Sequence, residues 1–360
     1  MRIAIIGSGK IGAALARLWV AAGHEVVLSY ARDADRLQQL AQSLGPSASV
    51  ATPAEAAAAG DVVVLSVPWP QVDDALTAAG AADGGLDGRV LVDTCNPFAS
   101  PGGPLDLPAG AVSAALEGAR RSPGARVVKA FNTLYFVTLG ERGGAGATDG
   151  DRLAMPVSGD DPDAKELVSG LVRDAGYEPV DIGSLGGAAR QEPGGPVYGE
   201  ELTATQVRDR LRELEATNLA LGRRFVTEVL GAQDSAAFLE LVDPDVVVNS
   251  GMSPLAPMVG RDAFAAGLGT LAAFTFVDFT LEDLLAVEDR VIARYRAHGD
   301  HTGDQLGVPA TGKRVTMWET RLMRWRGGRL VEDFVADINY DWPWLVAPAY
   351  PDGVGRTGRG

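Results

Sequence analysis

The segment Gly7-Ser8-Gly9-Lys10-Ile11-Gly12 carries a Gly-x-Gly-x-x-Gly pattern near the start of the 360-residue chain. It follows a short β-branched run, Ile3–Ile6, and opens a stretch of helix formers, Ile11–Ala22. A glycine turn between a strand and a helix can hold a dinucleotide pyrophosphate at the helix N-terminus. We expect Gly7 to make the turn, Gly9 to let the backbone approach the pyrophosphate and Gly12 to allow close helix–strand packing. The segment therefore predicts cofactor contacts from its six residues: Gly7, Ser8, Gly9, Lys10, Ile11 and Gly12.

Around this turn, short apolar runs alternate with helix-like stretches over the first half of the chain. The runs Val62–Val67 and Val90–Val92 are almost continuously apolar, whereas Ala34–Leu44 and Ala164–Ala175 mix apolar with charged residues. This alternation is typical of βαβ units whose parallel strands are covered on both faces. We therefore expect an α/β Rossmann domain, built on a doubly wound parallel sheet, over residues 1–200.

The pattern changes after Gly195-Pro196. Residues 201–216 are mostly helix formers and predict a helical linker, with a break in the helix near Thr217-Asn218. Farther on, Arg314–Arg326 and Leu330–Ile338 alternate polar with apolar residues and predict long strands after two helices. We expect an α+β domain over residues 217–345 and a flexible tail over 346–360.

The composition excludes several functional classes. Hydrophobic residues make up 46% and charged residues 22%, as in globular proteins. The formal charge of -15 argues against nucleic-acid or anionic-membrane partners, which would be repelled. The apolar runs are shorter than the ~20 residues of a membrane helix, and the apolar start is too short for a signal peptide, so a soluble, cytoplasmic protein is expected. One cysteine and three histidines predict no metal site.

The end of the second expected strand bears on the choice between NAD and NADP. An acid there would bind the ribose hydroxyls of NAD, but the chain reads Leu28-Ser29-Tyr30-Ala31-Arg32-Asp33. Arg32 and Arg36 can meet a 2′-phosphate, so we expect NADP, with Tyr30 and Ala31 beside it. Asp33 favours NAD unless it lies in the first turn of the next helix, where the helix dipole favours an acid. The arginines could also be solvated surface charge.

The first 200 residues resemble the family of F420-dependent NADP oxidoreductases, whose domain also occurs in the cytosolic part of STEAP-type metalloreductases. The motifs that carry the resemblance are Gly7–Gly12, Ser29–Asp33, Ser66-Val67-Pro68-Trp69, Asn96-Pro97, Val127–Thr133 and Ser158-Gly159-Asp160-Asp161. The resemblance implies an NADP-binding Rossmann domain that passes hydride between the nicotinamide and a second, flat redox partner. It places four residues beside the nicotinamide and its ribose: Ser66, Val67, Pro68 and Asn96.

Two positions depart from that family. The archaeal F420 enzymes carry His where this chain has Asn132, and their serine–arginine pair at the 2′-phosphate is replaced by Tyr30 and Ala31. F420 and a flavin are therefore both open as the second redox partner. Reduction of a carbonyl or imine would also need a proton donor. Asn132 is the catalytic candidate, with Lys129 and Tyr135 as alternatives, and each could instead be a packing residue.

Residues 217–345 resemble the SnoaL-like polyketide cyclases of the NTF2-like superfamily. The segments that carry this resemblance include Leu219–Leu230, His301-Thr302-Gly303-Asp304, Gly307–Lys313 and Gly327–Glu332 leading to Asp337. The resemblance implies an α+β cone around an apolar cavity, in which an aspartate of raised pKa acts as general acid and base on an enol-forming ketone. We expect Asp337 and His301 to be catalytic, although many NTF2-like domains bind ligand or dimerise without catalysis. Arg321 stands where the cyclases often carry His.

Taken together, the two halves predict a bifunctional tailoring enzyme of polyketide-type natural-product biosynthesis. An NADPH-dependent reductase would be fused to a cyclase or isomerase that acts on the same small molecule, a polycyclic or aromatic ketone. We expect a homodimer with no nucleic-acid or membrane partner. One alternative is an NADPH-dependent F420 or flavin reductase whose C-terminal domain only binds ligand or dimerises. Another is a regulatory protein that senses NADP.

Overall fold

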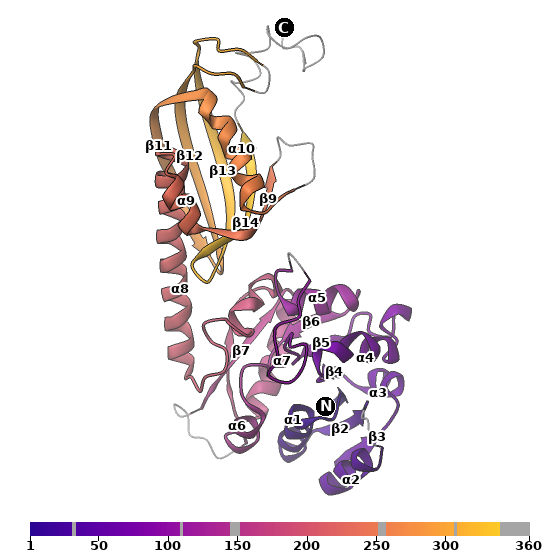
Figure 1. The fold of residues 1–360 in the computed structure, drawn as a ribbon. Coiled ribbons are helices and arrows are strands. Elements are labelled where there is room, and N and C mark those ends of the chain that lie inside the picture. Colours follow the sequence, from indigo (N-terminus) through magenta and orange to yellow (C-terminus); the bar gives the residue numbers. More distant parts are fainter. Residues whose placement is uncertain (31–33, 109–110, 145–151, 251–256, 306–307, 339–360) are drawn as a thin grey trace, which may run out of the picture. The chain divides into compact units, whose positions relative to one another are not determined.

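The computed structural model describes residues 1–30, 34–108, 111–144, 152–250, 257–305 and 308–338, with the side chains of 337 and 338 left out (Figure 1). The chain divides into two compact units, Met1–Leu211 and Arg212–Gly360. The division falls inside residues 201–216, where a helical linker was expected. Among the described residues, no helix combines the length and the apolar character needed to cross a membrane.

The first unit is built on an eight-stranded sheet in the order β3-β2-β1-β4-β5-β6-β7-β8. Strands β1 to β6 are parallel, while β7 pairs antiparallel with β6 and parallel with β8. The order 3-2-1-4-5-6 is that of a doubly wound Rossmann sheet, so the predicted fold class is confirmed. The strands are β1 (Arg2–Ile6), β2 (Glu25–Ser29), β3 (Ala48–Val50), β4 (Val62–Leu65), β5 (Val90–Asp93), β6 (Arg126–Lys129), β7 (Ala154–Gly159) and β8 (Glu178–Asp181).

Helices cover both faces of this sheet. Ile3 and Ile5 point into one core with residues of α1, α2 and α7, whereas Ala4 and Ile6 point into another with residues of α3, α4 and α5. Burial on both faces explains why the central strands β1, β4 and β5 are almost entirely apolar. The helices are α1 (Lys10–Ala21), α2 (Ala34–Leu44), α3 (Pro53–Ala59), α4 (Val72–Ala78), α5 (Ala114–Arg121), α6 (Phe136–Glu141) and α7 (Pro162–Asp174), with short turns η1 (Gly45–Ser47), η2 (Trp69–Gln71), η3 (Ala81–Asp83) and η4 (Leu185–Gln191).

The second unit is a six-stranded sheet in the order β10-β9-β14-β13-β12-β11, antiparallel except for the pair β9 and β14. The helical elements pack against one face of this sheet, and the predicted α+β fold is confirmed. The elements are α8 (Ala204–Arg224), η5 (Phe225–Gly231), α9 (Ser235–Leu241), β9 (Val242–Ser250), β10 (Met258–Val259), α10 (Arg261–Gly269), η6 (Thr270–Ala273), β11 (Phe274–Val287), β12 (Arg290–His301), β13 (Arg314–Arg326) and β14 (Arg329–Ile338).

The helix break expected near Thr217-Asn218 is wrong. Helix α8 continues to Arg224 and passes into a π-helical turn at Phe225. The Thr217 hydroxyl donates a hydrogen bond to the Glu213 carbonyl oxygen at 2.8 Å, which satisfies this side chain inside the helix. Strong helix formers on either side then carry the helix through the position.

Candidate functional site

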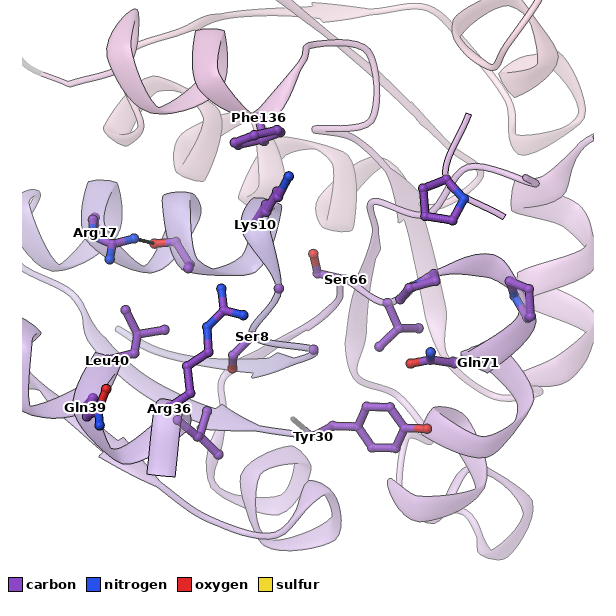
Figure 2. A pocket seen from close by; sticks show the side chains of 18 of the residues that line it. Ser8, Lys10, Arg17, Tyr30, Arg36, Gln39, Leu40, Ser66, Gln71 and Phe136 are labelled. Carbon is purple, nitrogen blue, oxygen red and sulfur yellow. Dashed lines mark hydrogen bonds between the residues drawn. The ribbon is translucent and has the colours of Figure 1, made fainter. Parts of the chain in front are cut away.

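A cavity of about 920 Å³ lies along the carboxyl ends of β1, β2 and β4 (Figure 2). Within the sheet, β2 is the neighbour of β1 on one side and β4 is its neighbour on the other side. In doubly wound sheets this switch point is where ligands bind. The volume is in the range of small-molecule and cofactor sites, ~300–1,000 Å³. The cavity therefore has the place and the size of a dinucleotide site.

The glycine turn has the geometry that the sequence predicts. Gly7 adopts a φ of 106°, and a Cβ there would lie 2.2 Å from the Ser66 carbonyl oxygen. A Cβ on Gly12 would lie 2.1 Å from the Gly7 carbonyl oxygen, so the helix approaches the turn too closely for a side chain. A Cβ on Gly9 would meet nothing within 4 Å. The open space above Gly9, at the N-terminus of α1, fits a pyrophosphate group.

The α2 side of the cavity carries positive charge. Arg36 lines it, and Figure 2 shows this side chain extending from α2 toward the turn that carries Ser8. Tyr30 lines it as well, with a φ of 54°, a conformation uncommon for residues other than glycine and enriched at functional sites. Ala31 and Arg32, also predicted here, lie outside the described residues. Three residues that were not predicted from the sequence follow Arg36 at helical spacing and line the same cavity: Gln39, Leu40 and Ser43.

The opposite side of the cavity is formed by Ser66, Val67 and Pro68, as expected. Figure 2 shows the Ser66 side chain within this space. The sequence reasoning missed Arg17 and Phe136. Arg17 follows Lys10 by seven residues in α1, a helical spacing that could have found it. The cavity lining also includes Pro70, Gln71, Ala99, Ser100 and Pro101.

Three expected contacts support this site without lining the cavity themselves. Ile11 packs against the core and Gly12 lies under the turn. Asn96, which follows β5, is bonded to Asn132, which follows β6. The Asn96 Nδ2 donates to the Asn132 carbonyl oxygen at 2.9 Å, and the Asn132 Nδ2 donates back to the Asn96 Oδ1 at 3.0 Å. The Asn132 Nδ2 also donates to the Gln191 carbonyl oxygen at 2.8 Å. These amides tie the carboxyl ends of β5 and β6 together.

Lys129, the last residue of β6, is fully buried. Its Nζ lies 2.9 Å from the Asp93 Oδ2 and donates to the Cys95 carbonyl oxygen. Burial by itself would lower the pKa of Lys129, but Asp93, Glu192 and Cys95 raise it on balance. Burial also raises the pKa of the Cys95 thiol. Lys129 is therefore a charged group held inside the protein, and it cannot reach a substrate as a proton donor.

The second unit holds an ion cluster on the inner, helix-covered face of its sheet, made of Arg321, Asp333, Glu319 and Tyr295. The Arg321 guanidinium donates to the Asp333 carboxylate, lies 2.7 Å from the Glu319 Oε1 and donates to the Tyr295 Oη at 3.2 Å. Burial raises the pKa of Asp333 to about 6, with Arg321 opposing and Glu319 adding to the shift. Two carboxylates share one guanidinium, so the cluster can hold a proton near neutral pH.

The structure does not bring together the two residues expected to be catalytic in this unit. His301 ends β12, where its buried ring lies with Nδ1 3.0 Å from the Thr311 Oγ1. The backbone of Asp337 pairs with Thr320, which pairs with Arg294, seven residues before His301 on β12. At ~3.3 Å per residue this offset along the sheet is ~23 Å. The side chain of Asp337 lies outside the described part of the structure.

No group of three or more His, Cys, Asp or Glu residues that could hold a metal ion occurs among the described residues.

Comparisons with known families match both halves of the chain. Residues 2–97 match the family described as NADP oxidoreductase coenzyme F420-dependent. Residues 220–336 match the family of SnoaL-like polyketide cyclases. Each match therefore falls within one of the two units.

Individual relatives resemble between half and two thirds of the chain. An F420-dependent NADP reductase of Methanothermobacter thermautotrophicus is 34% identical over 237 residues, which cover 61% of this chain and 96% of that protein. The metalloreductase STEAP3 of Rattus norvegicus is 31% identical over 191 residues, or 53% of this chain, and the match spans only 36% of STEAP3. The solved structure of a hypothetical protein from Sinorhizobium meliloti superposes with a TM-score of 0.50 at 29% identity, covering 56% of this chain and 95% of that one.

Proposed function

This chain belongs to the family of F420-dependent NADP oxidoreductases, and we propose that it uses NADPH to reduce a polycyclic or aromatic ketone in polyketide-type natural-product biosynthesis. Its SnoaL-like domain would cyclise or isomerise the same scaffold. The observation that carries the proposal is the cavity in which the glycine turn lies between Arg36 on one side and Ser66 to Pro68 on the other. A helix N-terminus, an arginine and the apolar side chains of Val67 and Pro68 thus line one site.

Each part of this cavity has a task in holding the cofactor. The backbone N–H groups from Gly9 onward would bind the pyrophosphate, and Arg36 would pair with the 2′-phosphate that distinguishes NADP from NAD. On the other side, Val67, Pro68 and Phe136 would exclude water from the nicotinamide. NADPH, when bound, supplies a hydride, and the protein's contribution is to orient the acceptor beside it.

The match to the SnoaL-like polyketide cyclases supports an acid/base role for the second unit. Acid/base chemistry on an enol-forming ketone needs a group that gives and takes a proton near neutral pH. Burial raises the pKa of Asp333 to about 6, but this carboxyl group is fully buried and does not itself meet a substrate. Asp337 and His301 stay predicted members of this machinery. Fusion of the two units would raise the effective concentration of the intermediate at the second site.

We extend the proposal to a homodimer formed through the second unit. The helices cover one face of its sheet, and the other face exposes large apolar side chains, namely Val277, Leu285, Trp318 and Phe334. A second copy of this face would bury them. Light scattering should give the mass of a dimer for the wild type and of a monomer for Trp318→Glu.

A second candidate function is an NADPH-dependent F420 or flavin reductase whose second unit only binds ligand or dimerises. The match over 96% of an F420-dependent NADP reductase favours it. In this case the flat acceptor would lie against the nicotinamide, and no ketone would react.

The two candidates are separated by the acceptor that NADPH reduces. We expect NADPH oxidation with the aromatic ketones 1-tetralone and 2-acetylnaphthalene, with one alcohol formed per NADPH. Arg36→Ala should raise the KM for NADPH roughly tenfold or more, because it removes a charge-assisted hydrogen bond to the phosphate. Oxidation with F420 or FMN but with neither ketone would favour the second candidate and contradict the first.

A further inference from the structure

Tyr198 lies beside the amide pair at the ends of β5 and β6. Its neighbour Gly199 donates a backbone hydrogen bond to the Thr133 carbonyl oxygen at 2.9 Å, which fixes this segment to the loop after β6. The Tyr198 hydroxyl oxygen accepts a hydrogen bond from the Asn96 Nδ2 at 3.4 Å. Tyr198 is partly exposed, unlike the buried Asn132 and Lys129.

Tyr198 does not line the cavity, but it is bonded to the start of a loop that lines the side expected to hold the nicotinamide. Arg36 marks the adenosine half and the glycine turn marks the pyrophosphate, so the nicotinamide must lie on the opposite side. That side is lined by Ser66 to Pro68 and by Ala99 to Pro101. Asn96 begins the loop that continues into Ala99 to Pro101. We infer that a phenol bonded to Asn96 lies near the edge where the acceptor is expected.

We propose that Tyr198 donates the proton that completes ketone reduction in this site, an inference that rests on the proposed reductase function. A carbonyl carbon that accepts a hydride from NADPH leaves the electron pair of its π bond on oxygen. Tyr198 gives this oxygen its proton, so the products are the alcohol, NADP⁺ and a tyrosinate. A proton from solvent then restores the phenol. The ketone thereby gains two electrons and two hydrogens, one as hydride from NADPH and one as a proton from Tyr198.

The surroundings of Tyr198 suit this task. Burial raises the pKa of the phenol, while the positive charge of Lys129 lowers it, and the balance is upward. The phenol therefore keeps its proton at neutral pH. Because its oxygen accepts from Asn96, its own O–H is free to point at a substrate, and no acceptor for it occurs among the described residues. Once the proton has left, the Asn96 amide and the Lys129 ammonium stabilise the tyrosinate.

The other polar groups at this edge are less suited. Asn132 is a carboxamide with no acidic proton, and both of its N–H bonds are directed at protein oxygens. Lys129 is fully buried. Tyr135 is 66% exposed, and its ring packs against Phe136 with 4.4 Å between the ring centroids. Tyr135 therefore offers a matched phenol without the Asn96 and Lys129 environment.

The test compares Tyr198→Phe with Tyr135→Phe in the full chain, using NADPH with 1-tetralone and 2-acetylnaphthalene. We expect Tyr198→Phe to lower the rate of reduction roughly 10²-fold or more, because a general acid is lost. Its rate should also fall about tenfold per pH unit between about pH 7 and 9, since solvent must then supply the proton, whereas the wild-type rate stays flat. Tyr135→Phe should keep the wild-type rate and profile.

A second readout needs no substrate and no cofactor. The near-ultraviolet difference between wild type and Tyr198→Phe during a pH titration reports when this phenol ionises. We expect Tyr198 to stay neutral through about pH 9, in keeping with its raised pKa. Ionisation near pH 7, an unchanged rate and pH profile in Tyr198→Phe, or a loss found in Tyr135→Phe instead would each overturn the assignment. Failure of the wild type to reduce either ketone contradicts the proposed function itself.

Discussion

Asp333 lies fully buried in the ion cluster of the second unit, and its ionisation opposes folding. Burial raises its pKa to about 6 in the folded protein, against ~3.9 for an exposed aspartate. Between these two values the folded state binds more protons than the unfolded state. Stability of the second unit is therefore lost as the pH rises through this window and is constant above it.

This loss of stability with rising pH should be measurable when the second unit is melted in scanning calorimetry. Raising the pH from 5 to 7 should lower the free energy of unfolding of the second unit by about 1 kcal/mol, because Asp333 loses its proton. This change lowers Tm by roughly 3–4 °C. Asp333→Asn should remove this part of the pH dependence, and Asp283→Asn, at an exposed position of β11, should leave it in place. An equal pH dependence in wild type and Asp333→Asn would show that the carboxyl group does not carry it.

Residues were predicted from the sequence only where one residue type is dictated by the backbone or by a local pattern. Gly7, Gly9 and Gly12 could be found because a turn of this kind admits no other residue at two of the positions. Tyr198 could not be found, because its bond to Asn96 joins residues 102 positions apart. The Arg321 cluster could be predicted only in part. Glu319 and Arg321 alternate on one strand, but Asp333 comes from the neighbouring strand.

At the scale of elements, two glycines of the N-terminal strand–turn–helix unit have different tasks, one in binding and one in folding. Gly9 has an ordinary φ of -72° and open space where a Cβ would lie, whereas a Cβ on Gly12 would overlap the Gly7 carbonyl. Gly9 therefore leaves space for a ligand, whereas Gly12 lets the helix pack closely against the turn.

Gly9→Ala should keep the wild-type Tm within about 2 °C and weaken NADPH binding at least roughly tenfold, because the new methyl group occupies the place of the pyrophosphate. Gly12→Ala should instead lower stability by roughly 1–3 kcal/mol, the usual cost of overpacking. Gly170→Ala, in α7 with nothing near its Cβ, is the control. Unchanged NADPH binding in Gly9→Ala would place the pyrophosphate elsewhere.

Elements were predicted well where the periodicity was strong and less well where it was weak. The apolar runs of β1, β4 and β5 were clear because both of their faces are buried. The strands β3 and β8 were missed, since β3 has no buried residue and β8 has one. The continuation of α8 past Thr217 was missed because a hydroxyl that bonds to its own helix has no signature in the sequence.

At the scale of the whole molecule, the chain joins two units for which we propose two kinds of chemistry. The first holds the cavity proposed for NADPH, and the second holds a buried acid cluster. If NADPH binds only to the first unit, it should raise the melting temperature of that unit alone. The free energy of unfolding of that unit should rise by about 2.7 kcal/mol at a ligand concentration of 100 Kd. A shift of both transitions would show that the second unit takes part in binding.

The central claim is that the cavity of the first unit binds NADPH through the glycine turn and Arg36. Calorimetric titration of the full chain with NADPH and with NADH tests it most directly. We predict that NADPH binds roughly 10- to 100-fold more tightly than NADH, and that Arg36→Ala removes most of this difference. Equal binding of NADPH and NADH by the wild type, or no binding of either, would contradict the account.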